Sequence, residues 1–179
     1  MIKVNIKEEN GWKKLFYKDM NLWLKGYIFN KKIEILLKEL KSLPLIKIED
    51  YLCKLDGHFA LVIQTKSLTL VSVDKIRSIP IFWMDNEINI HAPTMVKNNK
   101  LNKLNQDAIL SIKMSGYTIN EDTIYQGLNS LIAGQYVIFN KNKVKRNYYY
   151  SPLPLKALSE INYKKNLAST TLSIIKKMI

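Results

Sequence analysis

The pattern that most constrains the architecture of this chain is LDGHFALVI, at residues 55–63. After a polar break at Lys66 and Ser67, a second apolar run fills residues 68–73. Two short apolar runs joined in this way are typical of a β-hairpin, and their nearly continuous apolar character indicates that both faces are covered. We therefore predict a central hairpin that lies between other layers of the protein.

Further strands are predicted on both sides of this hairpin. Aromatic and branched residues fill residues 22–29, as expected of a strand. Two more hairpins are predicted at residues 80–92 and 135–150. The sheet content should therefore be high.

Three segments before the C-terminal region have the pattern of helices. In residues 31–43, apolar side chains recur three and four positions apart, and Pro44 ends the pattern. Residues 48–57 fit a second helix, with Gly57 as its C-terminal cap, and residues 105–113 fit a third. The mixture of elements predicts an α+β fold.

The C-terminal region differs from the rest. SPLPLK, at residues 151–156, is typical of a linker, because proline neither continues a helix nor joins a central strand. Residues 162–179 then form an amphipathic helical pattern without a stop signal, and its apolar stripe includes Leu167 and Ile174. We expect one domain at residues 1–152, and a linker with the first helix of a further domain at residues 153–179.

Composition limits the classes of function. The 179 residues suit one domain, and no apolar run approaches the roughly 20 residues that cross a membrane. The N-terminus has no signal-peptide pattern, so we expect a cytoplasmic protein without membrane partners. Cys53 is the single cysteine, which excludes an internal disulfide and disfavours a cysteine-based metal site. A lone cysteine in a helix is more typical of a small buried hydrophobe than of a nucleophile.

A net charge of +13 raises the question of nucleic-acid binding. Only two of the 28 basic residues, Arg77 and Arg146, are arginines, and the lysines recur along almost the whole chain. Arginine is the preferred residue for forked phosphate and base contacts. The charge therefore favours a compositional bias over a nucleic-acid site.

Four segments resemble, in order and spacing, the N-terminal domain of the asparagine synthetase family. KGYIFN is similar to the family's Asn-Gly-x-Ile-Tyr-Asn, and LDGHFALVI to its Leu-x-Gly-x-Phe-Ala-Phe strand. VDKIRSIPIFW is similar to Arg-Asp-x-x-Gly-x-x-Pro-Leu-Tyr. The fourth segment, GYTINEDTIYQGLNSLIAGQYVIF followed by YYY, is similar to a Thr-Ile-x-x-Gly turn that leads to a closing hairpin. The segments occupy residues 25–30, 55–63, 73–83 and 116–150.

The resemblance implies a class II glutamine amidotransferase domain of the N-terminal-nucleophile type. Its fold is a four-layer αββα sandwich of two mainly antiparallel sheets. In the family, a C-terminal synthetase domain uses ATP and magnesium to adenylate a carboxylate, which ammonia or another amine then attacks. The implied partner is this chain's own synthetase domain, a homodimer stays open, and no cofactor is expected within these residues.

The departures from the family pattern concern the chemistry. The family's nucleophile is a cysteine directly after the initiator methionine, whereas this chain has Ile2. The family's oxyanion pair is Asn-Gly, and here it is Lys25 and Gly26. The segments that hold the substrate glutamine have no counterpart in residues 30–51. We expect no catalytic residue and no metal site in this chain.

The loop after the second apolar run also departs from the family pattern. The family's arginine and glycine positions hold Val73 and Arg77, which flank Asp74 and precede Ser78. An ion pair of Asp74 with Arg77 would close the turn locally, and such surface pairs contribute little to stability. Alternatively, Arg77 and Ser78 contact a further domain or an anion.

The favoured hypothesis is thus a glutaminase-inactive domain with a structural or interface role in an asparagine-synthetase-like amide-forming enzyme. Two alternatives stay open: an active glutamine-hydrolysing asparagine synthetase, and a stand-alone basic binding module. His58 and His91 lack partners at metal-ligand spacing and are predicted to be strand-end residues. The tyrosines at residues 148–150 are predicted to pack across strands.

Overall fold

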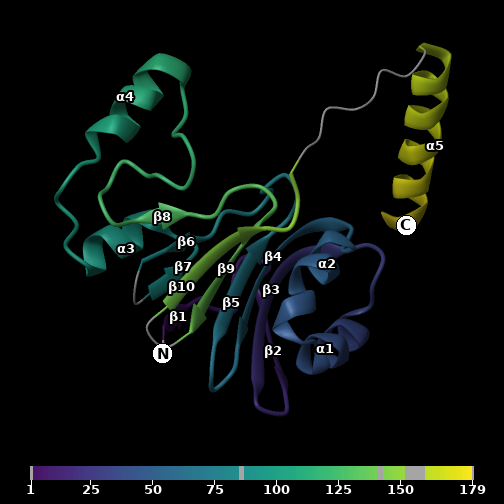
Figure 1. The fold of residues 1–179 in the computed structure, drawn as a ribbon, viewed down its shortest axis with the longest axis horizontal. Coiled ribbons are helices and arrows are strands. Elements are labelled where there is room, and N and C mark those ends of the chain that lie inside the picture. The colour runs from purple at the N-terminus through teal and green to yellow at the C-terminus, as the bar shows by residue number, and fades with distance from the viewer. Residues whose placement is uncertain (1, 85–86, 141–142, 152–159, 179) are drawn as a thin grey trace.

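The structure, a computed structural model, describes residues 2–84, 87–140, 143–151 and 160–178. A six-stranded antiparallel sheet lies at its centre, with the strand order β10-β9-β5-β4-β3-β2 (Figure 1). The strands are β2 (Lys13–Tyr17), β3 (Met20–Ile28), β4 (Gly57–Gln64), β5 (Thr69–Val73), β9 (Gln135–Asn140) and β10 (Lys143–Tyr148). The predicted central hairpin is confirmed as β4 and β5, which occupy the middle of this sheet.

A second, four-stranded sheet packs on the first, with the order β1-β7-β6-β8. Its strands are β1 (Lys3–Asn5), β6 (Phe82–Trp83), β7 (Glu87–Asn89) and β8 (Asn129–Ser130). β1 and β7 run parallel, and the other named strand pairs of both sheets are antiparallel. The two sheets confirm the expected mainly antiparallel arrangement.

Two apolar clusters, one on each face of the six-stranded sheet, form the core. The first lies between this sheet and the helices α1 (Ile33–Ser42) and α2 (Ile48–Cys53), and it includes Leu36, Leu52 and Leu61. The second lies between the two sheets and includes Trp23, Val62 and Trp83. Successive residues of β4 thus serve different clusters, because side chains alternate across a strand.

The remaining helices lie outside this pair of layers. α3 (Ala92–Asn98) covers the outer face of the four-stranded sheet and buries Met95. α4 (Gln106–Ser115) stands away from the sheets, and α5 (Glu160–Met178) forms a separate helix (Figure 1). With α1 and α2 on one side and α3 on the other, the order of layers is αββα. Among the described residues, no helix is long and apolar enough to cross a membrane.

Several local expectations were wrong or incomplete. α2 ends at Cys53, and Gly57 begins β4 instead of capping the helix. Cys53 is exposed, so it is not the buried hydrophobe that its helical position suggested. Sequence reasoning missed β1, β2 and α3. The predicted linker falls almost wholly on residues 152–156, outside the described part of the chain.

The outer face of the four-stranded sheet holds a small polar network under α3. The buried Glu87 carboxylate accepts hydrogen bonds from the side-chain amides of Asn5 (2.7 Å), Asn99 (3.0 Å) and Asn89 (3.3 Å). Burial would raise the pKa of Glu87, but these three bonds and the nearby Lys3 ammonium bring it below its ordinary value. The network therefore joins β1, β7 and the end of α3 through a charged carboxylate.

We expect Leu61→Ala to destabilise the protein by about 2 to 5 kcal/mol, because it leaves a cavity in the core beside α1 and α2. Leu61 has no exposed surface, whereas Ile46, the matched control, is 88% exposed. Ile46→Ala should change the free energy of unfolding by less than about 0.5 kcal/mol. Urea denaturation measures both values, and equal effects would contradict the burial described for β4.

Glu87→Gln should lower stability at pH 7 by about 1 to 2 kcal/mol, because the amide cannot accept all three hydrogen bonds as a carboxylate does. The pKa of Glu87 is lowered in the folded state, so its contribution is present above the unfolded pKa of about 4.3 and is lost as pH falls through the folded value. Denaturation at pH 7 and pH 3 should therefore show the gap between the two proteins narrowing in acid. The exposed Glu34→Gln is the control, and a gap for Glu87→Gln that stays constant to pH 3 would contradict this assignment.

Candidate functional site

The loop that follows β5 is organised by the carboxylate of Asp74, which has no exposed surface. Its Oδ1 accepts a hydrogen bond from the backbone N–H of Ile76 (2.8 Å), and its Oδ2 accepts one from that of Phe59 (3.1 Å). The backbone N–H of Ser78 (3.1 Å) and the Ser78 hydroxyl also donate to Oδ2. A buried carboxylate requires such partners. Asp74 therefore fixes the shape of the loop.

The backbone of Asp74 joins its own loop to two further segments. Its N–H donates to the Phe59 carbonyl (2.9 Å). Its carbonyl accepts from the N–H groups of Arg77 (3.1 Å) and Gly134 (3.0 Å). Asp74 thus connects β4, its own loop and the turn before β9.

Tyr149 closes the same region from the end of β10. Its buried hydroxyl donates to the carbonyl of Val73 (2.7 Å). Burial, with the Asp74 charge nearby, raises the pKa of Tyr149 well above its ordinary value. The phenol therefore stays protonated and remains a donor.

Arg77 does not pair with Asp74. Its guanidinium donates to the hydroxyl of Ser130 on β8 (2.7 Å), and no Asp74–Arg77 ion pair occurs among the described residues. Burial lowers the pKa of Arg77, but a guanidinium keeps its charge in proteins. Arg77 thus links the loop of one sheet to a strand of the other, and the expected local ion pair is replaced by this bond.

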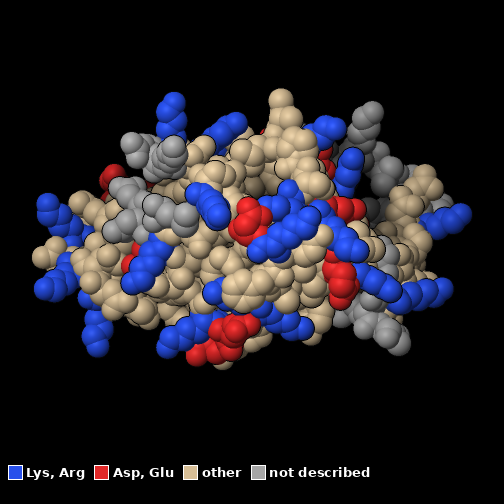
Figure 2. Space-filling model, turned by 90° about the horizontal axis from the view of Figure 1, so that it is seen from below, with Lys and Arg blue, Asp and Glu red and all other residues tan. Residues whose placement is uncertain are grey.

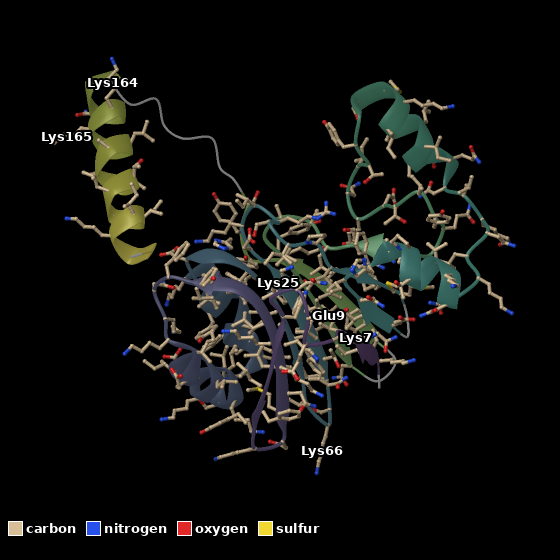
Figure 3. All side chains as sticks on the ribbon, turned by 180° about the vertical axis from the view of Figure 1, so that it is seen from behind. Lys7, Glu9, Lys25, Lys66, Lys164 and Lys165 are labelled. Carbon is tan, nitrogen blue, oxygen red and sulfur yellow. The ribbon has the colours of Figure 1, made fainter. Side chains whose placement is uncertain are left out.

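Gly26 allows β3 to approach β4 and the loop closely. It lies opposite Phe59 with φ of +90°, a conformation that L side chains rarely adopt. A Cβ at this position would lie 2.1 Å from the His58 carbonyl oxygen and 3.0 Å from the Ile79 Cδ1. The adjacent Lys25 is half-buried, and its ammonium makes no hydrogen bond or ion pair with the described residues (Figure 3).

A crevice of about 230 Å³ lies beside Gly26. The charged residues that line it, Lys13 and Lys31, are both cationic. Lys31 is already paired with Glu39. The crevice therefore offers no carboxylate to an ammonium group.

Ile2 lies far from Lys25 and Gly26. It is 8% exposed within the core between the sheets, and its carbonyl accepts from the Gln64 side chain (3.0 Å). Gln64 is four residues along β4 from Ala60, the partner of Lys25, or roughly 13 Å in an extended strand. The structure brings Gly26 and the Asp74 loop together but leaves Ile2 at the other end of the sheet.

The surroundings of His58 and His91 indicate structural roles for both residues. The His58 ring lies edge-on to Tyr27 (5.3 Å) and Phe29 (5.6 Å), and His91 precedes α3. Among the described residues there is no group of three or more His, Cys, Asp or Glu side chains that could hold a metal ion.

Sequence reasoning missed several members of this region. Ser130 carries no signal in the sequence, because a single serine in a short strand is unremarkable. Gly134 lies within the fourth segment that resembles the family, and its φ of +67° explains why glycine stands there. The buried role of Tyr149 was predicted only as packing. Three of the four family-like segments nevertheless meet at Asp74, and the first, at residues 25–30, pairs with β4 beside them.

Comparisons with known proteins concern the fold. No family model and no curated protein matches the sequence. The structure is similar to glutamine phosphoribosylpyrophosphate (PRPP) amidotransferase from B. subtilis, complexed with ADP and GMP, with a TM-score of 0.45 and 15% identity over 77% of this chain and 31% of that chain. It is also similar to the allosteric regulatory enzyme of purine biosynthesis, with a TM-score of 0.41 and 14% identity over 77% of this chain and 30% of that chain. This chain spans less than a third of either.

We expect Asp74→Asn to destabilise the protein by about 2 to 4 kcal/mol, because one oxygen that accepts hydrogen bonds becomes an amide that faces N–H donors. The matched control is Asp56→Asn, since Asp56 is exposed and its Lys75 partner lies 3.3 Å away on the surface. That change should alter stability by less than about 1 kcal/mol. Thermal unfolding measures both, and equal effects would contradict the organising role of Asp74.

Proposed function

We propose that this chain is a glutaminase-inactive domain of the class II glutamine amidotransferase type. It belongs to an asparagine-synthetase-like, ATP-dependent enzyme that forms amides, and its own role is structural. The observation that carries the proposal is that Asp74 joins three of the four family-like segments, and the first of them pairs with β4 at Gly26, while the family's nucleophile position holds Ile2. The scaffold of the domain is retained and its chemistry is lost.

The position of Ile2 supports the loss of the nucleophile. A catalytic thiol or hydroxyl must reach both a base and the donors that stabilise the developing oxyanion. Ile2 is apolar and buried between the sheets, and it contacts Gln64, which lies roughly 13 Å along β4 from Ala60, the partner of Lys25. The exposed Cys53 lies at the end of α2 and belongs to no cluster of catalytic side chains in the described part of the chain.

The surroundings of Gly26 support the loss of glutamine binding. Lys25 replaces the amide donor of the family's oxyanion pair. The crevice beside Gly26 has only cationic charges in its lining, so the ammonium group of glutamine would have no carboxylate partner there. The Asp74 carboxylate is occupied by donors from its own loop and from β4.

The partner in this proposal is the synthetase domain of the same enzyme. α5 exposes apolar side chains that a neighbouring domain would cover: Leu167, Leu172, Ile174 and Ile175, each between 43% and 58% exposed. Ile76, at the tip of the Asp74 loop, is 78% exposed and supplies a second contact. ATP and magnesium would bind in the synthetase domain, and free ammonia or another amine would attack the adenylated carboxylate.

The distribution of charge counts against the alternative of a basic nucleic-acid module. On the face in Figure 2, lysine and arginine side chains are spread over the whole width of the molecule, and acidic side chains lie among them. A nucleic-acid site gathers its cations along one patch or stripe. That alternative requires Lys25, Lys31, Lys32 and the turn from Lys141 to Arg146 to lie on one surface, and residues 141–142 of this turn lie outside the described part of the chain.

The intact chain should release no ammonia from L-glutamine above the buffer rate. Ile2→Cys combined with Lys25→Asn restores the family's residue types, but it should also be inactive, because the two positions lie at different ends of the sheet. Removal of Met1 from this variant is checked by mass spectrometry, and folding by thermal unfolding.

The unsubstituted chain and the double variant distinguish two ways in which the proposal could fail. If the unsubstituted chain released ammonia from L-glutamine, the domain would be an active glutaminase and the proposal would be wrong. Activity of the double variant alone would show that positions 2 and 25 meet, contrary to the structure.

A further inference from the structure

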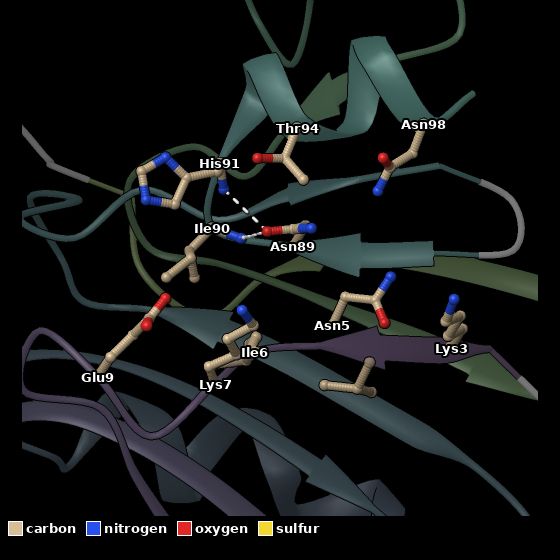
Figure 4. A pocket seen from close by; sticks show the side chains of 11 residues that line it. Lys3, Asn5, Ile6, Lys7, Glu9, Asn89, Ile90, His91, Thr94 and Asn98 are labelled. Atoms are coloured by element: carbon tan, nitrogen blue, oxygen red, sulfur yellow. Dashed lines mark hydrogen bonds between the residues drawn. The ribbon is translucent and has the colours of Figure 1, made fainter. Parts of the chain in front are cut away.

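A second crevice, of about 550 Å³, opens beside the parallel strands β1 and β7. It lies at the four-stranded sheet, and none of its lining residues also lines the crevice beside Gly26. Figure 4 shows the Lys7 ammonium and the Glu9 carboxylate on one side of it, with the His91 ring across from them. Thr94 and Asn98 project into it from α3 (Figure 4).

The crevice results from the topology of the sheet. β1 and β7 are paired in parallel as far as Asn5 and Asn89. Beyond Asn5 the chain leads to β2 in the six-stranded sheet, and beyond Asn89 it enters α3 on the outer face. The two segments diverge at the carboxyl ends of the paired strands, and the crevice opens beside them.

The floor of the crevice is rigid, because its polar groups are already paired. The Asn89 side-chain carbonyl accepts from the backbone N–H groups of Ile90 (2.8 Å) and His91 (3.1 Å). Asn5 and Asn89 both donate to the buried Glu87. Because these side chains already form hydrogen bonds within the protein, they have little capacity left to bond to a ligand.

The rim, in contrast, carries opposite charges that the fold does not use. Lys7 and Glu9 are exposed and two residues apart, yet neither side chain makes a hydrogen bond or an ion pair with any described residue. The side chains of Thr94 and Asn98 are likewise without hydrogen bonds among the described residues. The crevice thus presents two cations, Lys3 and Lys7, one anion, Glu9, and neutral hydrogen-bonding groups around a single cavity. Lys3 lies close to the Glu87 carboxylate, whose pKa it helps to lower, so Lys7 is the cation to pair with Glu9 in binding a ligand.

We propose that this crevice binds a small zwitterion that carries a carboxylate and an ammonium group, as a free α-amino acid does. Lys7 binds the carboxylate and Glu9 binds the ammonium group, through charge-assisted hydrogen bonds. Thr94 and Asn98 orient the rest of the molecule. The volume lies within the 300 to 1,000 Å³ that is common for small-molecule sites. This site does not depend on the proposed loss of glutaminase activity, because it uses another sheet and other residues.

The test is a titration of the ¹⁵N-labelled chain, followed by amide chemical shifts. The ligand is L-alanine, and the matched controls are propionate and ethylammonium, each of which keeps only one charged group. L-alanine should give saturable shifts at residues 7–9 and 91–98. The two controls should bind at least about fivefold more weakly.

Variants identify the two charges. Lys7→Gln and Glu9→Gln should each weaken L-alanine binding about fivefold or more. Lys66→Gln, in the turn between β4 and β5, and Glu34→Gln, on α1, remove the same charges elsewhere and should leave binding unchanged. The absence of saturable shifts with L-alanine would overturn the proposal, as would equal binding of propionate or unchanged binding in both crevice variants.

Discussion

The burial of one carboxylate holds three of the four family-like segments of this protein together. Asp74 has no exposed surface, so each of its polar atoms needs a partner within the protein. Those partners come from the start of β4, from its own loop and from the turn before β9. A single aspartate therefore fixes a loop, a hairpin and a later turn relative to one another. The Tyr149 hydroxyl adds a bond to Val73, the residue before Asp74.

In the proposed function, this constraint allows the domain to keep its scaffold without the family's catalytic groups. The groups that position the segments are buried and donate or accept within the fold. The positions that carry chemistry in the family, by the resemblance, are Ile2 and Lys25, and neither takes part in the Asp74 network. A substitution at either position would leave the hydrogen bonds of the loop in place.

The elements with strong local patterns could be predicted from the sequence. The central hairpin and α1 have continuous apolar character or helical spacing, and both are present as expected. β1 and α3 could not be predicted, since three residues with polar neighbours and a seven-residue helix with proline near its start have little periodic signal. The partner of Arg77 could not be predicted either, because Ser130 is 53 residues away and reaches it only through the packing of the two sheets. The second crevice depends on the parallel pairing of β1 with β7, which lie far apart in the sequence. No local sequence pattern indicates this pairing.

The lysines on the outermost strands have a consequence for self-association. β2 and β10 form the two edges of the six-stranded sheet, and their free backbone groups could pair with the edge of another molecule. Lys13 lies on one edge, and Lys143 and Lys145 lie on the other, all exposed. Two such edges would bring like charges together, and charged edge residues oppose the growth of a sheet by strand addition. The basic character of the chain therefore acts as a barrier to aggregation, and this barrier weakens as salt screens the charges.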